Sequence, residues 1–156
     1  MRDPVITYFD YDGELELPEE GVAICDGSPH YFWLREPLPE PGSAIFDIAP
    51  IAKSLLALVS EYESIWRDWD RAYHSGEVEL STHPIVEGNN PRFVELSKHI
   101  SAQAAELHKM ARPRPGVVEL SGRFLALSRE HAGKRWPIPG FTSAELEITW
   151  HVPDAA

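Results

Sequence analysis

The strongest pattern in the chain is a stripe of apolar residues at helical spacing between positions 50 and 75. A second, narrower stripe runs through 90–112, where Asn90 can cap the helix and Pro91 takes its first position. Gly76 ends the first stripe and Pro113 the second. The first stripe comprises Ile51, Leu55, Leu58, Val59, Tyr62, Ile65, Trp66, Trp69 and Tyr73, and the second Phe93, Leu96, Ile100, Ala104, Leu107 and Ala111. The two stripes predict two amphipathic helices.

The first fifty residues have the pattern of antiparallel strands. Val5–Asp10 and Glu14–Leu17 flank Tyr11-Asp12-Gly13, which predicts a hairpin with a three-residue loop and with Asp10 opposite Glu14. Such a register pairs Phe9 with Leu15 and Thr7 with Leu17. A second hairpin is expected from Val22–Cys25 and His30–Arg35 around a turn at 26–29. The unbroken apolar run 31–34 favours a strand that is covered on both faces.

The C-terminal part adds strands to this sheet. The run Arg112-Pro113-Arg114-Pro115-Gly116 favours a break, followed by a strand at Val117–Leu120. Phe124–His131 fits a short helix, Glu77–Leu80 fits a short strand, and Leu146–Val152 alternates as a final strand does.

We therefore expect an α+β fold: a mainly antiparallel sheet, made of the N-terminal hairpins and the C-terminal strand, with two long amphipathic helices packed on one face. One domain of 156 residues is the expected organisation. Its parts are an acidic hairpin region (1–49), helix one (50–75), helix two (90–112), and C-terminal strands with a short helix (117–152).

The charge of the chain is unevenly distributed, and this distribution bears on the partners that we expect. The formal net charge is −11, and residues 1–50 hold 11 acidic residues against 2 basic ones. The segment 112–135 is instead rich in arginine and lysine, so it could face the acidic third within one molecule or across a dimer. The acidity of the whole chain argues against nucleic acid as a partner.

Cysteine usage and hydropathy bear on the compartment. Cys25 is the single cysteine, so no intrachain disulfide can form. The N-terminus lacks the pattern of a signal peptide, and the apolar run 48–59 is interrupted by Pro50, Lys53 and Ser54. We expect a cytoplasmic protein that has no contact with a membrane.

The segment Val5-Ile6-Thr7-Tyr8-Phe9-Asp10-Tyr11-Asp12-Gly13-Glu14-Leu15 resembles the first motif of the haloacid dehalogenase-type phosphatases. The resemblance implies that Asp10 and Asp12 bind Mg²⁺ and transfer a phosphoryl group, on a strand of a parallel sheet. It covers about eleven residues, and Glu14 stands where that family has Thr or Val. Asp12-Gly13 also fits a tight hairpin turn.

Other groups could carry chemistry. Asp10, Asp12, Glu14 and Glu16 could bind a cation or form a solvated acidic face. Asp70 and His74, four residues apart, could orient a general base or make an exposed helix contact. The seven histidines lack metal-ligand spacing, so we expect no metal and no cofactor.

The leading hypothesis is a small binding or regulatory protein whose acidic surface engages a basic protein partner. Inhibitors and toxin-neutralising immunity proteins belong to this class. The candidate partner-binding residues are Asp10, Asp12, Glu14, Glu16 and the aromatic anchors Trp33 and Trp136. The alternatives are a small metal-dependent phosphoester hydrolase that uses Asp10 and Asp12 or Asp70 and His74, and a subunit that associates with itself.

Overall fold

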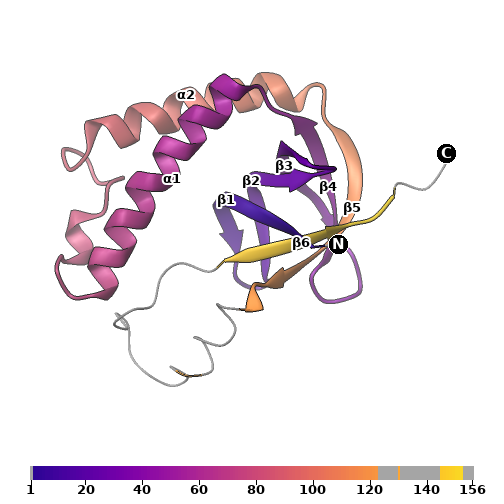
Figure 1. The fold of residues 1–156 in the computed structure, drawn as a ribbon, viewed down its shortest axis with the longest axis horizontal. Coiled ribbons are helices and arrows are strands. Elements are labelled where there is room, and N and C mark those ends of the chain that lie inside the picture. Colours follow the sequence, from indigo (N-terminus) through magenta and orange to yellow (C-terminus); the bar gives the residue numbers. More distant parts are fainter. Residues whose placement is uncertain (1, 123–129, 131–144, 153–156) are drawn as a thin grey trace.

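Six antiparallel strands form a closed β-barrel in the computed structural model, which describes residues 2–122, 130 and 145–152 (Figure 1). Each strand pairs with the next one along the chain, and β1 pairs with β6 through Asp3–Ile148 and Pro4–Glu147. The strands are β1 (Asp3–Asp12), β2 (Leu17–Cys25), β3 (Ser28–Pro37), β4 (Ser43–Pro50), β5 (Arg112–Leu120) and β6 (Leu146–Trp150).

The expected α+β fold, an open sheet with helices packed on one face, is wrong because the sheet closes on itself. Closure removes the unpaired edges that an open sheet would present. Two elements that the sequence analysis did not assign as strands make it possible. One is β4, and the other is the start of β5, where Arg112-Pro113-Arg114-Pro115 was expected to be a break.

The proline-rich start of β5 is compatible with a strand because the backbones of Pro113 and Pro115 face the same edge of that strand. The Pro115 carbonyl accepts a hydrogen bond from the His151 amide, so this side faces the end of β6. The ladder with β6 begins only at Gly116, whereas the ladder with β4 already begins at Arg112. The missing N–H groups of Pro113 and Pro115 therefore interrupt no ladder.

The interior of the barrel is a hydrophobic core. Alternate residues of each strand point inward, and Phe32 of β3 meets Phe46 of β4 edge to face, with ring centroids 5.5 Å apart. The other buried members are Val5, Leu17, Ala23, Ala44, Val118, Leu146 and Ile148. Side chains thus fill this small barrel, and functional chemistry has to be sought on its outside.

Two helices cover part of the outer surface of the barrel (Figure 1). They are α1 (Lys53–His74) and α2 (Pro91–His108), and they lie within the predicted ranges 50–75 and 90–112. Tyr31 and Trp33 point outward from β3 into a second buried cluster with residues of both helices. The prediction that the run 31–34 is covered on both faces is therefore confirmed.

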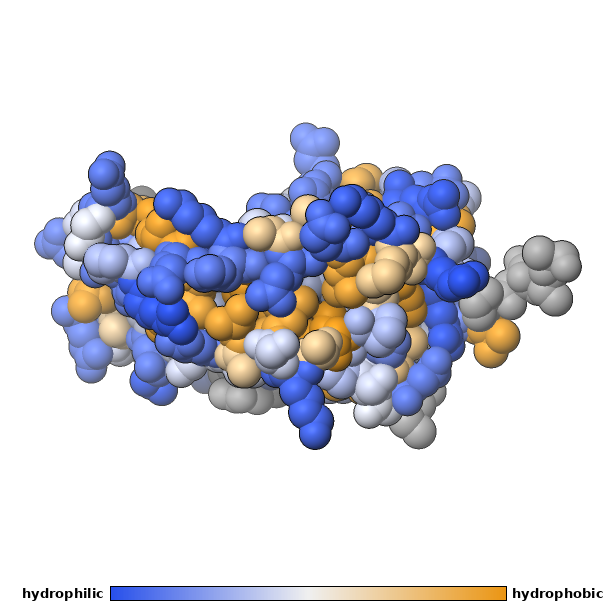
Figure 2. Space-filling view, turned by 90° about the horizontal axis from the view of Figure 1, so that it is seen from above, coloured by the Kyte–Doolittle hydropathy of each residue, from blue (hydrophilic) through white to orange (hydrophobic). Residues whose placement is uncertain are grey.

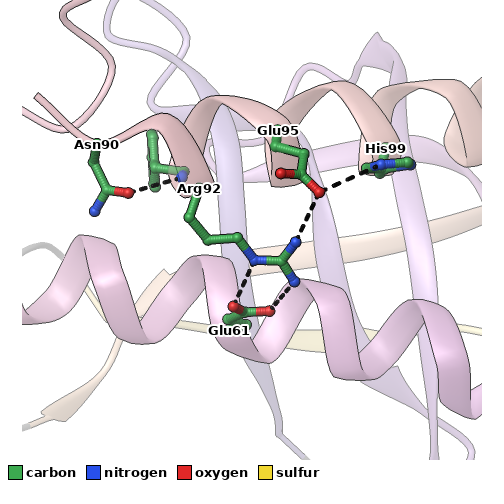
Figure 3. Close-up of polar contacts among 6 residues, drawn as sticks. Glu61, Asn90, Arg92, Glu95 and His99 are labelled. Atoms are coloured by element: carbon green, nitrogen blue, oxygen red, sulfur yellow. Dashed lines mark hydrogen bonds and ion pairs between the residues drawn. The ribbon is translucent and has the colours of Figure 1, made fainter. Parts of the chain in front are cut away.

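Polar contacts hold the two helices beside each other (Figure 3). Arg92 of α2 donates two hydrogen bonds to Glu61 of α1, at 2.8 and 2.6 Å, and one to Glu95 at 3.0 Å. The hydrogen bond from Arg92 lowers the pKa of Glu61. The Asn90 side chain accepts from the Phe93 amide at 3.0 Å, so the predicted cap is present.

The first hairpin differs from its prediction. Asp12 pairs with Leu17 and Thr7 with Val22, so the predicted pairings of Thr7 with Leu17 and of Asp10 with Glu14 are wrong. Asp12 Oδ1 accepts hydrogen bonds from the amides of Glu14 and Leu15, both at 2.9 Å, which stabilises a longer turn.

Three further local predictions have different outcomes. The second hairpin closes at Asp26-Gly27, whose φ angles of 51° and 81° suit a two-residue turn. The expected strand at Glu77–Leu80 is absent, and a short 3-10 helix, η1 (Leu80–Thr82), lies there instead. The predicted helix at Phe124–His131 falls outside the described residues apart from residue 130. Among the helices that the structure describes, none is long and apolar enough to cross a membrane.

Candidate functional site

A cleft of about 420 Å³ opens between the outer surface of the barrel and the helix pair. It is within the size range of small-ligand sites in proteins. Strands β1, β2 and β3 form one wall, while α1, α2 and the segment between the helices form the other. The residues that line it are Tyr8, Phe9, Asp10, Glu20, Tyr31, Tyr62, Trp66, His83, Ile85, Phe93, Ser97, Ile100 and Ser101.

Aromatic rings in mutual contact make the apolar part of the cleft. Phe9 of β1 stacks on Tyr31 of β3 with centroids 5.8 Å apart, and it meets the Tyr62 ring of α1 edge to face at 5.2 Å. Tyr62 in turn stacks on Phe93 of α2 at 4.3 Å. The ring chain therefore crosses from the barrel to both helices and fixes the distance between the two walls.

Two carboxylates lie opposite each other where the cleft meets strands β1 and β2. Asp10 and Glu20 are Cα partners across the ladder, and both line the cleft. The Tyr31 hydroxyl donates to Glu20 Oε1 at 2.6 Å. Asp10 is exposed and has no hydrogen-bond or ion-pair partner among residues 2–122, 130 and 145–152. Since like charges directly opposite each other destabilise a strand pair, this arrangement favours a cation.

The acidic groups also act on the tyrosines. Burial, together with the nearby Glu63 and Asp10 carboxylates, raises the pKa of Tyr62 to about 12. Burial, together with the hydrogen bond to Glu20, raises the pKa of Tyr31 above its usual range. Both hydroxyls are protonated at neutral pH, so the tyrosines add hydrogen-bonding groups to the cleft without adding charge.

The segment between the helices closes one end of the cleft. The His83 ring lies against the indoles of Trp66 and Trp69, with centroids 5.1 and 4.6 Å apart. Burial lowers the pKa of His83, although the Asp70 carboxylate opposes this shift, so the imidazole is neutral at pH 7. The side of the cleft that faces Asp10 and Glu20 therefore carries no positive charge from His83.

Apolar side chains rim the cleft beside this segment. Ile85 lines the cleft and is 52% exposed, and Leu80 and Val86 are exposed nearby in the chain. Viewed from the helix side, apolar side chains form a band between rows of hydrophilic ones (Figure 2). Exposed apolar residues beside a charged cleft are typical of a surface that binds a protein.

The sequence-predicted acidic residues take different positions. Asp10 lies in the cleft, whereas Asp12 is engaged in the turn that its side chain stabilises. Glu14 and Glu16 are exposed on the same turn. The two carboxylates of the predicted phosphatase motif therefore do not form one site: Asp10 lies in the cleft and Asp12 stabilises the turn. The antiparallel barrel also lacks the parallel sheet that the resemblance implied.

Trp33, one of the two predicted aromatic anchors, does not line the cleft. Trp33 is only 9% exposed and lies under His108, with ring centroids 4.1 Å apart. Trp136 lies outside the described residues.

Asp70 and His74 form the expected pair within α1, but the pair is buried rather than exposed. His74 Nε2 lies 3.3 Å from Asp70 Oδ1, and each side chain is only 7% exposed. Neither residue lines the cleft. Within the part of the chain that the structure describes, no group of three or more His, Cys, Asp or Glu residues could hold a metal ion.

The acidic third and the basic segment do meet within one molecule, at single ion pairs. Arg114 of β5 donates to Asp26 at 2.8 Å, and in the reverse sense Arg2 of the acidic third pairs with Glu119 of the basic segment at 3.0 Å. These contacts lie away from the cleft, so they leave the charge of Asp10 and Glu20 uncompensated.

Sequence reasoning missed most of the cleft, including Glu20, Tyr31, Tyr62 and Phe93. Tyr62 and Phe93 were assigned to the apolar stripes of the two helices, which gives no sign that they also contact a ligand site. Comparison of the chain with family models, curated proteins and solved structures finds no match.

Proposed function

We propose that this protein is a non-catalytic binding protein that engages a basic protein partner at the cleft. The observation that carries the proposal is the pair Asp10 and Glu20, which lie opposite each other beside an aromatic cleft. No cation among the described residues compensates these two carboxylates. The pair therefore favours a positively charged ligand.

The surroundings of the pair support a protein as the partner. Glu14 and Glu16 are exposed on the neighbouring turn and extend the negative surface beyond the cleft. A field of this kind speeds the encounter with a basic protein, as in inhibitors and immunity-type proteins. The exposed Ile85 side chain supplies apolar area that would be buried on binding.

The proposed setting is the cytoplasm. Cys25 is buried, and burial raises the pKa of its thiol, so the residue fits a structural role in a reducing compartment.

The proposal is tested with a fluorescently labelled 12-residue peptide of lysine, arginine and glycine, and with a peptide in which glutamate replaces the basic residues. We expect anisotropy titration to show binding of the basic peptide alone, weakening steeply as salt is raised. The double variant Asp10→Asn/Glu20→Gln should weaken binding about tenfold, since it removes both carboxylates at the cleft.

A matched control removes the same charge from outside the cleft. The double variant Glu14→Gln/Glu16→Gln should weaken binding by less than about threefold, through the loss of long-range attraction alone. Equal effects of the two double variants, or no binding of the basic peptide at low salt, would contradict the proposal. So would a Mg²⁺-dependent phosphoester hydrolysis that Asp10→Asn abolishes.

A further inference from the structure

We infer that the cleft recognises an arginine side chain of the partner in preference to a lysine side chain. This inference rests on the proposed function and adds the identity of the group that enters the cleft. Three features of the cleft carry it: the number of open acceptors, the aromatic wall, and the polar groups of α2.

The acceptors at the carboxylate pair suit a planar donor with several N–H groups. Tyr31 occupies Glu20 Oε1, which leaves Glu20 Oε2 and both Asp10 oxygens as acceptors on two adjacent strands. Cα partners on antiparallel strands lie about 4.5–5.5 Å apart, so one group can reach both carboxylates. A guanidinium offers five donors in a fixed fork, whereas an ammonium offers three donors around one point.

The aromatic wall favours the same group. The rings of Phe9 and Tyr62 line the cleft directly beside the acidic pair. A guanidinium is weakly hydrated and stacks on aromatic rings, while an ammonium is strongly hydrated and retains its water. Bringing the charge into this cleft therefore costs less for arginine than for lysine.

The opposite wall supplies further acceptors. Ser97 and Ser101 lie one helical turn apart on α2, and both line the cleft. Their hydroxyls can accept N–H groups of a guanidinium that the carboxylates do not use. The neutral His83 at the closed end adds no repulsion.

Three 12-residue peptides test the inference. They are identical except that six positions hold arginine, lysine or citrulline, the last being a neutral analogue of arginine with nearly the same shape. We expect the arginine peptide to bind about tenfold more tightly than the lysine peptide, and the citrulline peptide to show no binding at the same concentrations.

Two pairs of variants test which residues cause the preference for arginine over lysine. Asp10→Asn/Glu20→Gln should abolish the preference for arginine over lysine, and Glu14→Gln/Glu16→Gln should retain it. Tyr62→Leu should reduce arginine binding more than lysine binding, and Tyr62→Phe, which keeps the ring, should restore the wild-type ratio. Circular dichroism spectra identify any variant that does not fold. If the carboxylate double variant does not fold, the Tyr62 variants provide the test, and if a Tyr62 variant does not fold, the carboxylate double variant provides it.

The outcomes separate the inference from the proposed function. Equal, salt-dependent binding of the arginine and lysine peptides that needs Asp10 and Glu20 would overturn the inference and leave the proposed function standing. A preference for arginine that survives Asp10→Asn/Glu20→Gln would overturn the inference too, because the selectivity would then lie elsewhere. Absence of binding by both charged peptides would overturn both.

Discussion

The imidazole of His108 lies flat on the indole of Trp33, with ring centroids 4.1 Å apart and ring planes inclined by 4°. His108 Nε2 also lies 3.5 Å from Asp47 Oδ2, on the neighbouring strand β4. This contact ties the last residue of α2 to the barrel, at the opposite end of the helix from the Asn90 cap. The position of α2 over the cleft therefore depends on this contact at its C-terminal end, whereas the Asn90 cap stabilises the helix itself.

Replacing His108 should weaken this attachment. We expect His108→Ala to lower the free energy of unfolding by about 0.5–1.5 kcal/mol, since it removes the stacked ring pair together with the contact to Asp47. Urea denaturation measures the loss. His99→Ala is the matched control, because His99 is exposed on the same helix and its nearest recorded contact is Glu95 at 3.9 Å. Equal losses in the two variants would show that the stacking contributes nothing.

Gly21 should tolerate no side chain, because two groups of the barrel approach it. A Cβ atom there would meet the carbonyl oxygen of Thr7 and would lie 2.8 Å from the ring of Phe32. We expect Gly21→Ala to cost about 1–3 kcal/mol or more of unfolding free energy, or to prevent folding. Gly13→Ala is the control, since a Cβ at Gly13 would meet nothing within 4 Å. Thermal unfolding followed by circular dichroism compares the two variants, and similar melting temperatures would contradict this account of Gly21.

Alkaline pH should destabilise the protein through its buried tyrosines. Burial raises the pKa of both Tyr8 and Tyr62 to about 12, whereas an unfolded tyrosine titrates near pH 10. The unfolded chain therefore loses protons first as the pH rises above 10. The stability that the two neutral hydroxyls contribute is fully present below pH 10 and is lost as the pH approaches 12. We expect the free energy of unfolding to fall by at least about 1 kcal/mol between pH 9 and pH 11.

The phenylalanine variants provide the control for this effect. Tyr8→Phe/Tyr62→Phe should reduce the pH dependence over the same interval, because two of the titrating hydroxyls are gone, while that of Tyr31, whose pKa is also raised, remains. Absorbance at 295 nm, which reports tyrosinate, should show the wild-type protein titrating at higher pH than free tyrosine. Two hydroxyls that titrate like free tyrosine would refute the prediction.

Mild acid should weaken ligand binding through His83. This imidazole is neutral at pH 7 because burial lowers its pKa, although Asp70 acts in the opposite direction. As the pH falls towards 5.5, protonated His83 would place a positive charge in the cleft and repel a cationic ligand. We expect the affinity for the arginine peptide to fall about threefold between pH 7 and pH 5.5, measured by titration at constant ionic strength.

Two histidine variants show whether His83 is responsible. His83→Gln should remove most of the pH dependence, and His99→Gln, a change at an exposed position on α2, should leave it as in the wild type. An unchanged dependence in His83→Gln would assign the effect to another group.

The helices could be predicted from the sequence because their boundaries are set by local groups. The Asn90 side chain satisfies an amide within its own helix, and the apolar stripes repeat over several turns. Closure of the barrel could not be predicted in this way. It depends on the pairing of Asp3 with Ile148, which are far apart in sequence, and the pattern of neither strand specifies that partner.

The acidic pair of the cleft was missed because one turn was predicted with the wrong length. A three-residue loop places Asp10 opposite Glu14, but two hydrogen bonds that Asp12 accepts stabilise a longer turn, in which Asp10 lies opposite Glu20. The charge pattern does not distinguish Glu14 from Glu20 as the partner of Asp10, since both pairings place two acidic residues opposite each other. Only the observed register puts the pair beside the aromatic wall that α1 and α2 complete.

Strands β4 and β5 are direct neighbours in the barrel, although α1 and α2 lie between them in the chain. Ile48 and Arg112, on either side of this helical excursion, are Cα partners. The barrel ladder is therefore continuous at the point where the helices leave and return. The helical wall of the cleft can consequently change in length and sequence while the strands keep their pairing. Under the proposed binding function, a change in this one insertion would alter which partner is bound, while the acidic pair on β1 and β2 stays constant.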